Sequence, residues 1–362
     1  MLSHILSGRF KSQPSLKMYS ARMLPLRFFH FKTSRAKFSV HNNLKFPHHF
    51  FKFVKEESDQ VGSLPEILDF LKDKDFLTKA LSCDDQHPIG SYLVEHFVFW
   101  LNSYAKNETF DLESYLSGKL SLELICKNFI TFCFSQGISL DEKKTLESFA
   151  YHNELSDGAV KDELMKISPK SEINLLGFGL DEGYYESMLS NFLIAQGKTS
   201  HVNLFGFDPY AKKNPNIRYL SSQQLVSKES PKFDVIVARW VLHHVELKYR
   251  WVEFINCVNQ CNPNATILVV EHGFSRGKVS FLNEKLNDFL NATFDVIANI
   301  GLRPRYFTNT SSEIGANFFI KYLNLSDLSS IKSGIQFPIS EKIYDVGPNF
   351  PNQTIFCMRA IK

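Results

Sequence analysis

Short apolar runs alternate with longer amphipathic stretches in the second half of the chain. The apolar runs, between about residues 171 and 273, are INLLGFG, VNLFGFD, IRYL, FDVIVAR and ATILVVEHG. Stretches with helical spacing lie among them, including YESMLSNFLIAQG and RWVEFINCVNQC. Strands that alternate with helices are typical of a parallel sheet, and continuous apolar runs indicate strands that are covered on both faces.

The end of the chain breaks this alternation. SDLSSIKSG predicts a short helix, and EKIYDVG and QTIFCMRAIK predict two strands in succession. Pro348, Asn349 and Pro351 lie between these strands and suit a turn, so we expect the two strands to pair antiparallel. The pattern predicts an α/β fold with a doubly wound, mostly parallel seven-stranded sheet and an antiparallel C-terminal strand pair.

A helical region precedes the sheet. Three stretches have apolar residues at helical spacing: SLPEILDFLKDKDFLTKAL, SYLVEHFVFWLNSYA and SLELICKNFITFCFSQG. Ser63 suits the N-cap of the first, and Gly137 suits the end of the third. We therefore assign residues 56–168 to a helical region and residues 169–362 to the sheet domain.

The charge is distributed unevenly. Residues 1–55 hold eleven Lys or Arg and no acidic residue, whereas the other 307 residues hold 30 basic and 38 acidic side chains, a net charge of −8. A basic leader with Ser, Leu and Phe is typical of a mitochondrial transit peptide. The alternative is a disordered basic arm that contacts RNA. We expect a mitochondrial protein; a cytoplasmic one is the alternative.

Composition excludes some classes of site. No stretch reaches the roughly 18–20 uncharged apolar residues that a transmembrane helix needs. None of the six cysteines forms a CxxC pair or has zinc spacing with histidine. The sequence therefore predicts buried thiols, no metal site and no transmembrane segment.

Two features at strand ends predict a cofactor site. The first apolar run ends in Gly177-Phe-Gly179, which would let a cofactor approach the backbone. The second ends in Asp208, and an acid at this position can accept hydrogen bonds from a ribose diol. A dinucleotide fingerprint needs a glycine where Glu182 stands, so a nicotinamide dehydrogenase is disfavoured.

Four motifs over residues 171–362 resemble those of the class I S-adenosylmethionine-dependent methyltransferases: LLGFG, GFDPY, FDVIVARWVLHHV and NPNATILVVEHG. Leu-His-His-Val is similar to a branch that holds many small-molecule and some tRNA methyltransferases. The resemblance implies S-adenosyl-L-methionine as cofactor, with Asp208 on the ribose. The cofactor-binding residues that it implies are Gly177, Gly179, Asp181, Asp208, Ser222, Gln223, Ala238 and Arg239.

The chain departs from the family pattern twice. Leu175 stands where the family usually has an acid, and Asp181 stands at the usual third glycine. Asp181 or Glu182 could supply the missing carboxylate at a helix N-terminus. Otherwise the site is degenerate, and the chain is a binding protein that has lost catalysis.

Four residues near the same sheet edge suit proton transfer near neutral pH. His243 and His244 follow FDVIVAR, and Glu271 and His272 end ATILVVEHG. These four are the catalytic candidates. For His243 the alternative is a structural role, in which it caps the turn through hydrogen bonds to the backbone.

The sequence indicates only the chemical class of the acceptor, the molecule that receives the methyl group. An insertion at residues 274–324 resembles a substrate lid, and its basic, aromatic segment (Arg303, Arg305, Tyr306, Phe307) suits either an anionic or planar substrate or an ordinary surface. The net charge of −8 over residues 56–362 favours a small-molecule or lipid-like acceptor. An RNA methyltransferase (rRNA, tRNA or cap) is the alternative, although the chain lacks the Asp/Asn-Pro-Pro-Tyr motif and a Lys-Asp-Lys-Glu set.

Overall fold

The computed structural model describes nine segments of the chain: 64–81, 88–107, 111–180, 182–208, 214–245, 247–272, 281–302, 325–346 and 353–361. All nine lie in one compact unit, Phe46–Lys362. The predicted leader, residues 1–55, lies outside the described residues.

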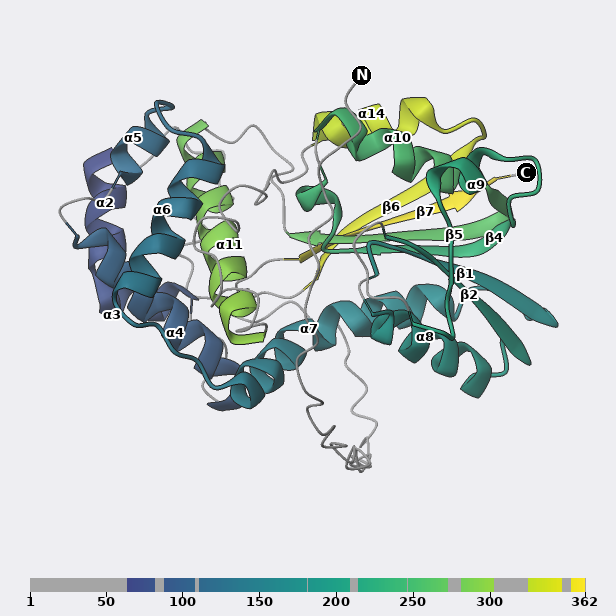
Figure 1. Ribbon diagram of the computed structural model, residues 1–362, viewed down its shortest axis with the longest axis horizontal. Coiled ribbons are helices and arrows are strands. Elements are labelled where there is room, and N and C mark those ends of the chain that lie inside the picture. Colours follow the sequence, from purple (N-terminus) through teal and green to yellow (C-terminus); the bar gives the residue numbers. More distant parts are fainter. Residues whose placement is uncertain are drawn as a thin grey trace, which may run out of the picture. The chain divides into compact units, whose positions relative to one another are not determined.

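A seven-stranded sheet forms the centre of the second half (Figure 1). Its strands are β1 (Glu172–Phe178), β2 (His201–Phe207), β3 (Arg218–Tyr219), β4 (Phe233–Arg239), β5 (Cys261–His272), β6 (Ile339–Val346) and β7 (Gln353–Ala360), in the order β3-β2-β1-β4-β5-β7-β6. Neighbours from β3 to β5 pair parallel, and β7 pairs antiparallel with β5 and β6. The predicted fold class, including the antiparallel C-terminal pair, is confirmed.

Both faces of the sheet are covered, as the continuous apolar runs predict. On one face, strand residues such as Leu176 and Ile236 pack against α10 (Leu247–Val258) and α14 (Leu325–Gly334). On the other face, residues such as Leu175 and Val235 pack against α7 (Glu142–Leu164) and α8 (Tyr184–Ala195). Figure 1 shows these two helix pairs on opposite sides of the sheet.

The first half is helical, as predicted. Its helices are α2 (Leu64–Lys72), α3 (Lys74–Leu81), α4 (Pro88–Ala105), α5 (Leu112–Leu116), α6 (Leu122–Ser135) and α7. The first predicted stretch is divided at Asp73 into two helices. Side chains of Ser121 and Asp141 accept hydrogen bonds from the first turns of α6 and α7 and so fix where these helices begin.

The insertion after β5 contains a long helix, α11 (Phe281–Leu302), that joins the helical region. Its buried residues, among them Phe289 and Phe294, share one apolar core with α4 and α6. Gly301 approaches α7 so closely that a Cβ atom there would lie 2.4 Å from Thr145 Oγ1. Helix α11 is therefore held by the helical region, and the basic, aromatic segment at 303–307 lies outside the described residues.

Candidate functional site

The strand order reverses between β1 and β4, whose connections run to opposite sides of the sheet. Crevices at such a switch point, outside the carboxyl ends of the strands, are the usual ligand sites of doubly wound sheets. Gly177 pairs in register with Gly206 of β2 and with Val237 of β4. The predicted glycine turn and Asp208 therefore follow neighbouring strands at this edge.

The glycine turn is packed tightly against other parts of the chain. Gly179 has φ +67°, and a Cβ atom there would lie 1.9 Å from Val241 Cγ2. At Gly177 a Cβ atom would lie 2.7 Å from Glu186 Oε1. Both glycines are thus required by packing as well as by any close approach of a cofactor.

Glu186 is a candidate site residue that the sequence analysis missed. It lies in the first turn of α8, is buried, and places its carboxylate against Gly177. Leu175, where the family pattern has an acid, is fully buried in the core instead. Glu186 supplies a carboxylate at this edge, where it can receive the ammonium group of the cofactor's methionine part.

Asp208 follows β2 directly and is half-buried. Gly179 N donates to Phe207 O (2.8 Å), which holds the glycine turn beside the residue that precedes Asp208. The carboxylates of Asp208 and Glu186 match the two polar ends of S-adenosylmethionine, a ribose diol and an ammonium group. The residues at this edge therefore fit the cofactor that the resemblance implies.

Other predicted cofactor residues lie in different surroundings. Ser222 and Gln223 begin α9 (Ser222–Val226) after β3, and both are exposed. Ala238 is fully buried and belongs to the core on the α10 side of the sheet. Asp181 lies outside the described residues.

Arg239 at the end of β4 faces α7 and α8. Its guanidinium group lies 3.9 Å from the ring centroid of Tyr185 and 4.4 Å from that of Trp240, and it forms an ion pair of 2.8 Å with Asp157. Trp240 has φ +49°, a left-handed conformation that is strained for a bulky residue. Arg239 therefore links the end of β4 to α7, and the chain turns sharply beyond it.

A buried cluster lies just beyond this turn. Glu271 and His272 end β5, and His243 lies in the 3₁₀ turn η1 (Leu242–His244). His243 Nδ1 is 2.6 Å from Glu271 Oε2, and the other carboxylate oxygen of Glu271 accepts from the backbone N–H groups of Val241 (3.1 Å) and Leu242 (2.8 Å). Glu271 thus holds both the turn and the imidazole.

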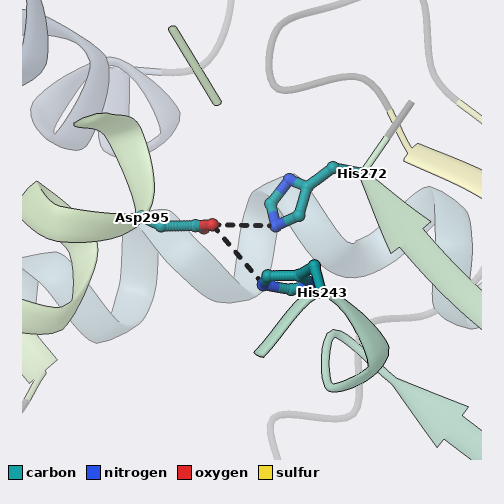
Figure 2. A group of neighbouring side chains, drawn as sticks. All are labelled: His243, His272 and Asp295. Carbon is teal, nitrogen blue, oxygen red and sulfur yellow. Dashed lines mark ion pairs between the residues drawn. The ribbon is translucent and has the colours of Figure 1, made fainter. Parts of the chain in front are cut away.

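Asp295 of α11 completes the cluster (Figure 2). Its Oδ2 atom is 3.1 Å from His272 Nε2 and 3.7 Å from His243 Nε2. All four side chains of the cluster are buried. In Figure 2 the carboxylate of Asp295 points toward both imidazole rings, which come from η1 and β5.

Mutual interactions decide the charges in this cluster. Burial by itself would raise the pKa of the Glu271 and Asp295 carboxyls, but His243 and His272 beside them hold each pKa below its ordinary value. Burial would lower the pKa of His272, but the adjacent Asp295 carboxylate raises it. The neighbouring histidines therefore stabilise the ionised form of each buried carboxylate.

The structure brings together three of the four predicted catalytic candidates. His243, Glu271 and His272 belong to the cluster, whereas His244 is exposed, with its ring centroid 4.0 Å from that of His243. The carboxylate of Glu271 bonds the backbone of this turn, and His243 pairs with that carboxylate; a turn-capping role for His243 stays a prediction. The converging nitrogen and oxygen atoms can accept a proton or bind a cation.

The comparisons with known proteins agree with this fold. A family model described as a methyltransferase domain matches residues 151–312. No curated protein matches the sequence. Among the helices that the structure describes, none is long and apolar enough to cross a membrane.

Three solved structures illustrate the likeness. The CurJ carbon methyltransferase is 14% identical, with a TM-score of 0.38 over 76% of this chain and 69% of its own. The methyltransferase SibL is 10% identical, with a TM-score of 0.44 over 75% and 74%. The N-methyltransferase NodS from Bradyrhizobium japonicum is 13% identical, with a TM-score of 0.32 over 58% and 99%.

These similarities are too low to carry any argument about the acceptor. The sheet order with its antiparallel β7 and the family match over residues 151–312 agree with the motifs at the strand ends. Residues 151–312 thus match a methyltransferase domain, and the sheet order and the strand-end motifs fit the class I fold with S-adenosyl-L-methionine as cofactor.

Proposed function

We propose that the protein transfers the methyl group of S-adenosylmethionine to a small-molecule or lipid-like acceptor that must lose a proton. One observation carries this proposal: the buried cluster of His243, Glu271, His272 and Asp295 lies at the same sheet edge as the glycine turn. The cofactor supplies an activated methyl group, and the chain supplies alignment and activation of the acceptor.

Strand register supports the closeness of the two parts. Gly177 of β1 pairs with Val237 of β4, and Arg239 of β4 pairs with Val270 of β5. Glu271, the first cluster residue on β5, comes directly after Val270. The cofactor edge and the cluster therefore occupy the carboxyl ends of three neighbouring strands, β1, β4 and β5.

The reaction at this edge is a displacement at the methyl carbon. The acceptor loses an O–H or C–H proton, and the freed electron pair attacks the methyl group. The electrons of the sulfur–carbon bond remain on sulfur, which becomes a neutral thioether, and the acceptor's proton passes to His243 of the cluster and from there to solvent. A buried cluster of imidazole and carboxylate groups suits an acceptor that needs such activation.

Burial also favours a small acceptor. His243 and Glu271 are each 1% exposed, so an acceptor reaches them only by passing between the side chains that cover them. A small or slender molecule can do so at lower cost than a folded polymer. The net charge of −8 outside the leader supports the same preference, because an RNA-binding surface needs basic groups to neutralise phosphates.

The test uses methyl-labelled S-adenosylmethionine and an extract separated into small-molecule, lipid, protein and RNA fractions. We expect label in the small-molecule or lipid fraction, and much less at low cofactor concentration with Asp208→Ala, because this change removes the proposed ribose ligand. Label in RNA would support the alternative acceptor. Cofactor binding by calorimetry with no label in any fraction would support the degenerate, non-catalytic alternative.

A further inference from the structure

His243, His272 and Asp295 direct three metal-binding atoms toward one point. The side chains come from η1, β5 and α11, and one ligand atom from each lies within 4.8 Å of the other two. We propose that these three residues bind one divalent transition-metal cation of the Zn²⁺ or Fe²⁺ type. The cation-binding site stands on these contacts alone; its use in catalysis, given below, rests on the proposed function.

The distances suit a shared cation. Two ligands bound at about 2.1 Å with tetrahedral angles lie about 3.4 Å apart. The distances from Asp295 Oδ2 to His272 Nε2 and His243 Nε2 are 3.1 Å and 3.7 Å, on either side of that value. The two imidazole nitrogens lie within 4.8 Å of each other, so binding one ion requires the histidine rings to adjust until all three atoms reach bonding distance.

Glu271 prepares His243 as a ligand. Its carboxylate lies 2.6 Å from Nδ1 and would hold a proton there, which would leave Nε2, on the side of Asp295, to bind the cation. Glu271 is itself fixed by the backbone N–H groups of Val241 and Leu242. Metal-binding histidines commonly donate their second nitrogen to such a carboxylate, which orients the ring and strengthens the ligand.

The donor set selects the class of metal. Two imidazoles and one carboxylate suit Zn²⁺ or Fe²⁺, whereas Mg²⁺ and Ca²⁺ prefer oxygen ligands. Three protein ligands leave at least one position open for water or for an acceptor oxygen. The sequence could not indicate this site, because His243, His272 and Asp295 are far apart in sequence and no short-spacing motif links them.

If the proposed function holds, the acceptor is a molecule whose oxygen binds the cation and either receives the methyl group itself or lies near the carbon that does. A hydroxyl group or an enolisable carbonyl bound there would lose its proton to water more readily, because the cation stabilises the resulting oxyanion. His243 would then be a ligand rather than the proton acceptor.

The first experiment uses Co²⁺ as a spectroscopic probe. Full-length protein is treated with a chelator, freed of it, and titrated with Co²⁺, Zn²⁺, Fe²⁺ without oxygen, and Mg²⁺. We expect one Co²⁺ per chain, with visible bands of nitrogen and oxygen coordination that Zn²⁺ abolishes and Mg²⁺ does not. Failure of the wild-type protein to bind one Co²⁺ or Zn²⁺ per chain would overturn the proposal, leaving an ion-pair cluster.

Variants locate the site. Asp295→Asn should weaken Co²⁺ binding at least 100-fold, and Glu271→Gln about 10–100-fold, the usual loss for a carboxylate that supports a histidine ligand. His244→Asn, next to the cluster but exposed, is the matched control and should bind like wild type. Equal binding by Asp295→Asn and wild type would place the ion elsewhere. If Asp295→Asn does not fold, the histidine NMR signals of the wild-type protein on adding Zn²⁺ decide the ligands.

The metal readout separates this inference from the proposed function. Cobalt bound at the cluster, with no methyl transfer to any fraction, would support the site and contradict the proposed function. Methyl transfer that continues undiminished in chelator-treated, metal-free protein would contradict the site's catalytic use and assign proton uptake to His243 directly.

Discussion

Gly179 and Val241 meet where the turn after β1 contacts the turn after β4. Gly179 has φ +67°, and a Cβ atom on it would lie 1.9 Å from Val241 Cγ2. Because Val241 N also donates to Glu271, this contact connects the glycine turn with the buried cluster. The shape of the cofactor edge therefore depends on the absence of a side chain at residue 179.

Gly179→Ala should destabilise the protein through backbone strain and a clash. The left-handed conformation costs an alanine about 1–2 kcal/mol, and overpacking adds about 1–3 kcal/mol. Gly197→Ala is the matched control, because Gly197 has φ +64° and a Cβ atom there would meet no other atom within 4 Å. Urea denaturation of both variants measures the difference.

The double variant Gly179→Ala/Val241→Ala isolates the clash. Its free energy of unfolding should be at least about 1 kcal/mol higher than the sum of the two single losses predicts, because the contacting methyl groups are gone. A Gly179→Ala variant that loses no more stability than Gly197→Ala would show that the turns do not touch as described.

Glu186 and Asp208 should bind opposite ends of the cofactor. Loss of a charge-assisted hydrogen bond costs about 1.5–3 kcal/mol, or about 10–150-fold in affinity. Glu186→Gln and Asp208→Asn should each weaken S-adenosylmethionine binding by this amount in calorimetry. Glu172→Gln, at the opposite end of β1 and exposed, is the control.

The nucleoside 5′-methylthioadenosine separates the two roles, because it keeps the ribose and lacks the amino-acid part. Asp208→Asn should weaken its binding, and Glu186→Gln should not. Equal losses for Glu186→Gln with both ligands would mean that Glu186 supports the glycine turn rather than the ammonium group.

The sequence predicts the sheet well because each strand has its own local pattern. Continuous apolar runs locate β1, β2, β4 and β5, and two successive strands without an intervening helix predict the antiparallel pairing of β6 and β7. The glycine turn and Asp208 follow from the same pattern, since parallel strands end at one edge. The strands and the residues at their ends can be predicted because each follows from the pattern of its own segment and from parallel pairing with the adjacent strand.

The rest of the site depends on tertiary contacts that have no local pattern. Asp295 is a single acid in an apolar part of its helix, and it becomes a site residue only because α11 packs beside η1 and β5. His243 and His244 are adjacent in sequence, yet the 3₁₀ turn buries one and exposes the other. Composition and spacing do not distinguish such residues.

Glu163 of α7 should give a pH-dependent contribution to stability. It is buried and pairs with Lys166, Lys342 and Arg359, which join α7 to β6 and β7. Burial would raise its pKa, but Lys166 and the other cations lower it below the ordinary value of 4.5. Its ionised form therefore stabilises the folded protein above about pH 4.5, and this contribution is lost as the pH falls through the lower pKa of the folded state.

Glu163→Gln should accordingly lower the free energy of unfolding by about 1–3 kcal/mol at pH 7, because the acceptor that these cations share loses its charge. The difference from wild type should shrink at pH 3. Glu341→Gln, which removes only the half-exposed pair with Lys332, should cost less than about 1 kcal/mol. A pH-independent loss for Glu163→Gln would point to packing rather than charge.

The last prediction concerns RNA. Residues 56–362 have a net charge of −8, and the eleven basic residues of the leader are absent from that part. A chain that begins at Ser39 loses most of the leader's positive charge and should bind mixed tRNA and rRNA fragments only at about 10⁻⁴ M or more weakly at physiological salt, the weak end of non-specific binding. The measurement is a salt titration, with the full chain measured in parallel.

Tight binding by the full chain alone would assign RNA contact to the leader, as a basic arm rather than a transit peptide. Micromolar binding by the shortened chain with a steep salt dependence would contradict the small-molecule preference, because several phosphates would then be neutralised by a basic surface that the linear charge count does not reveal.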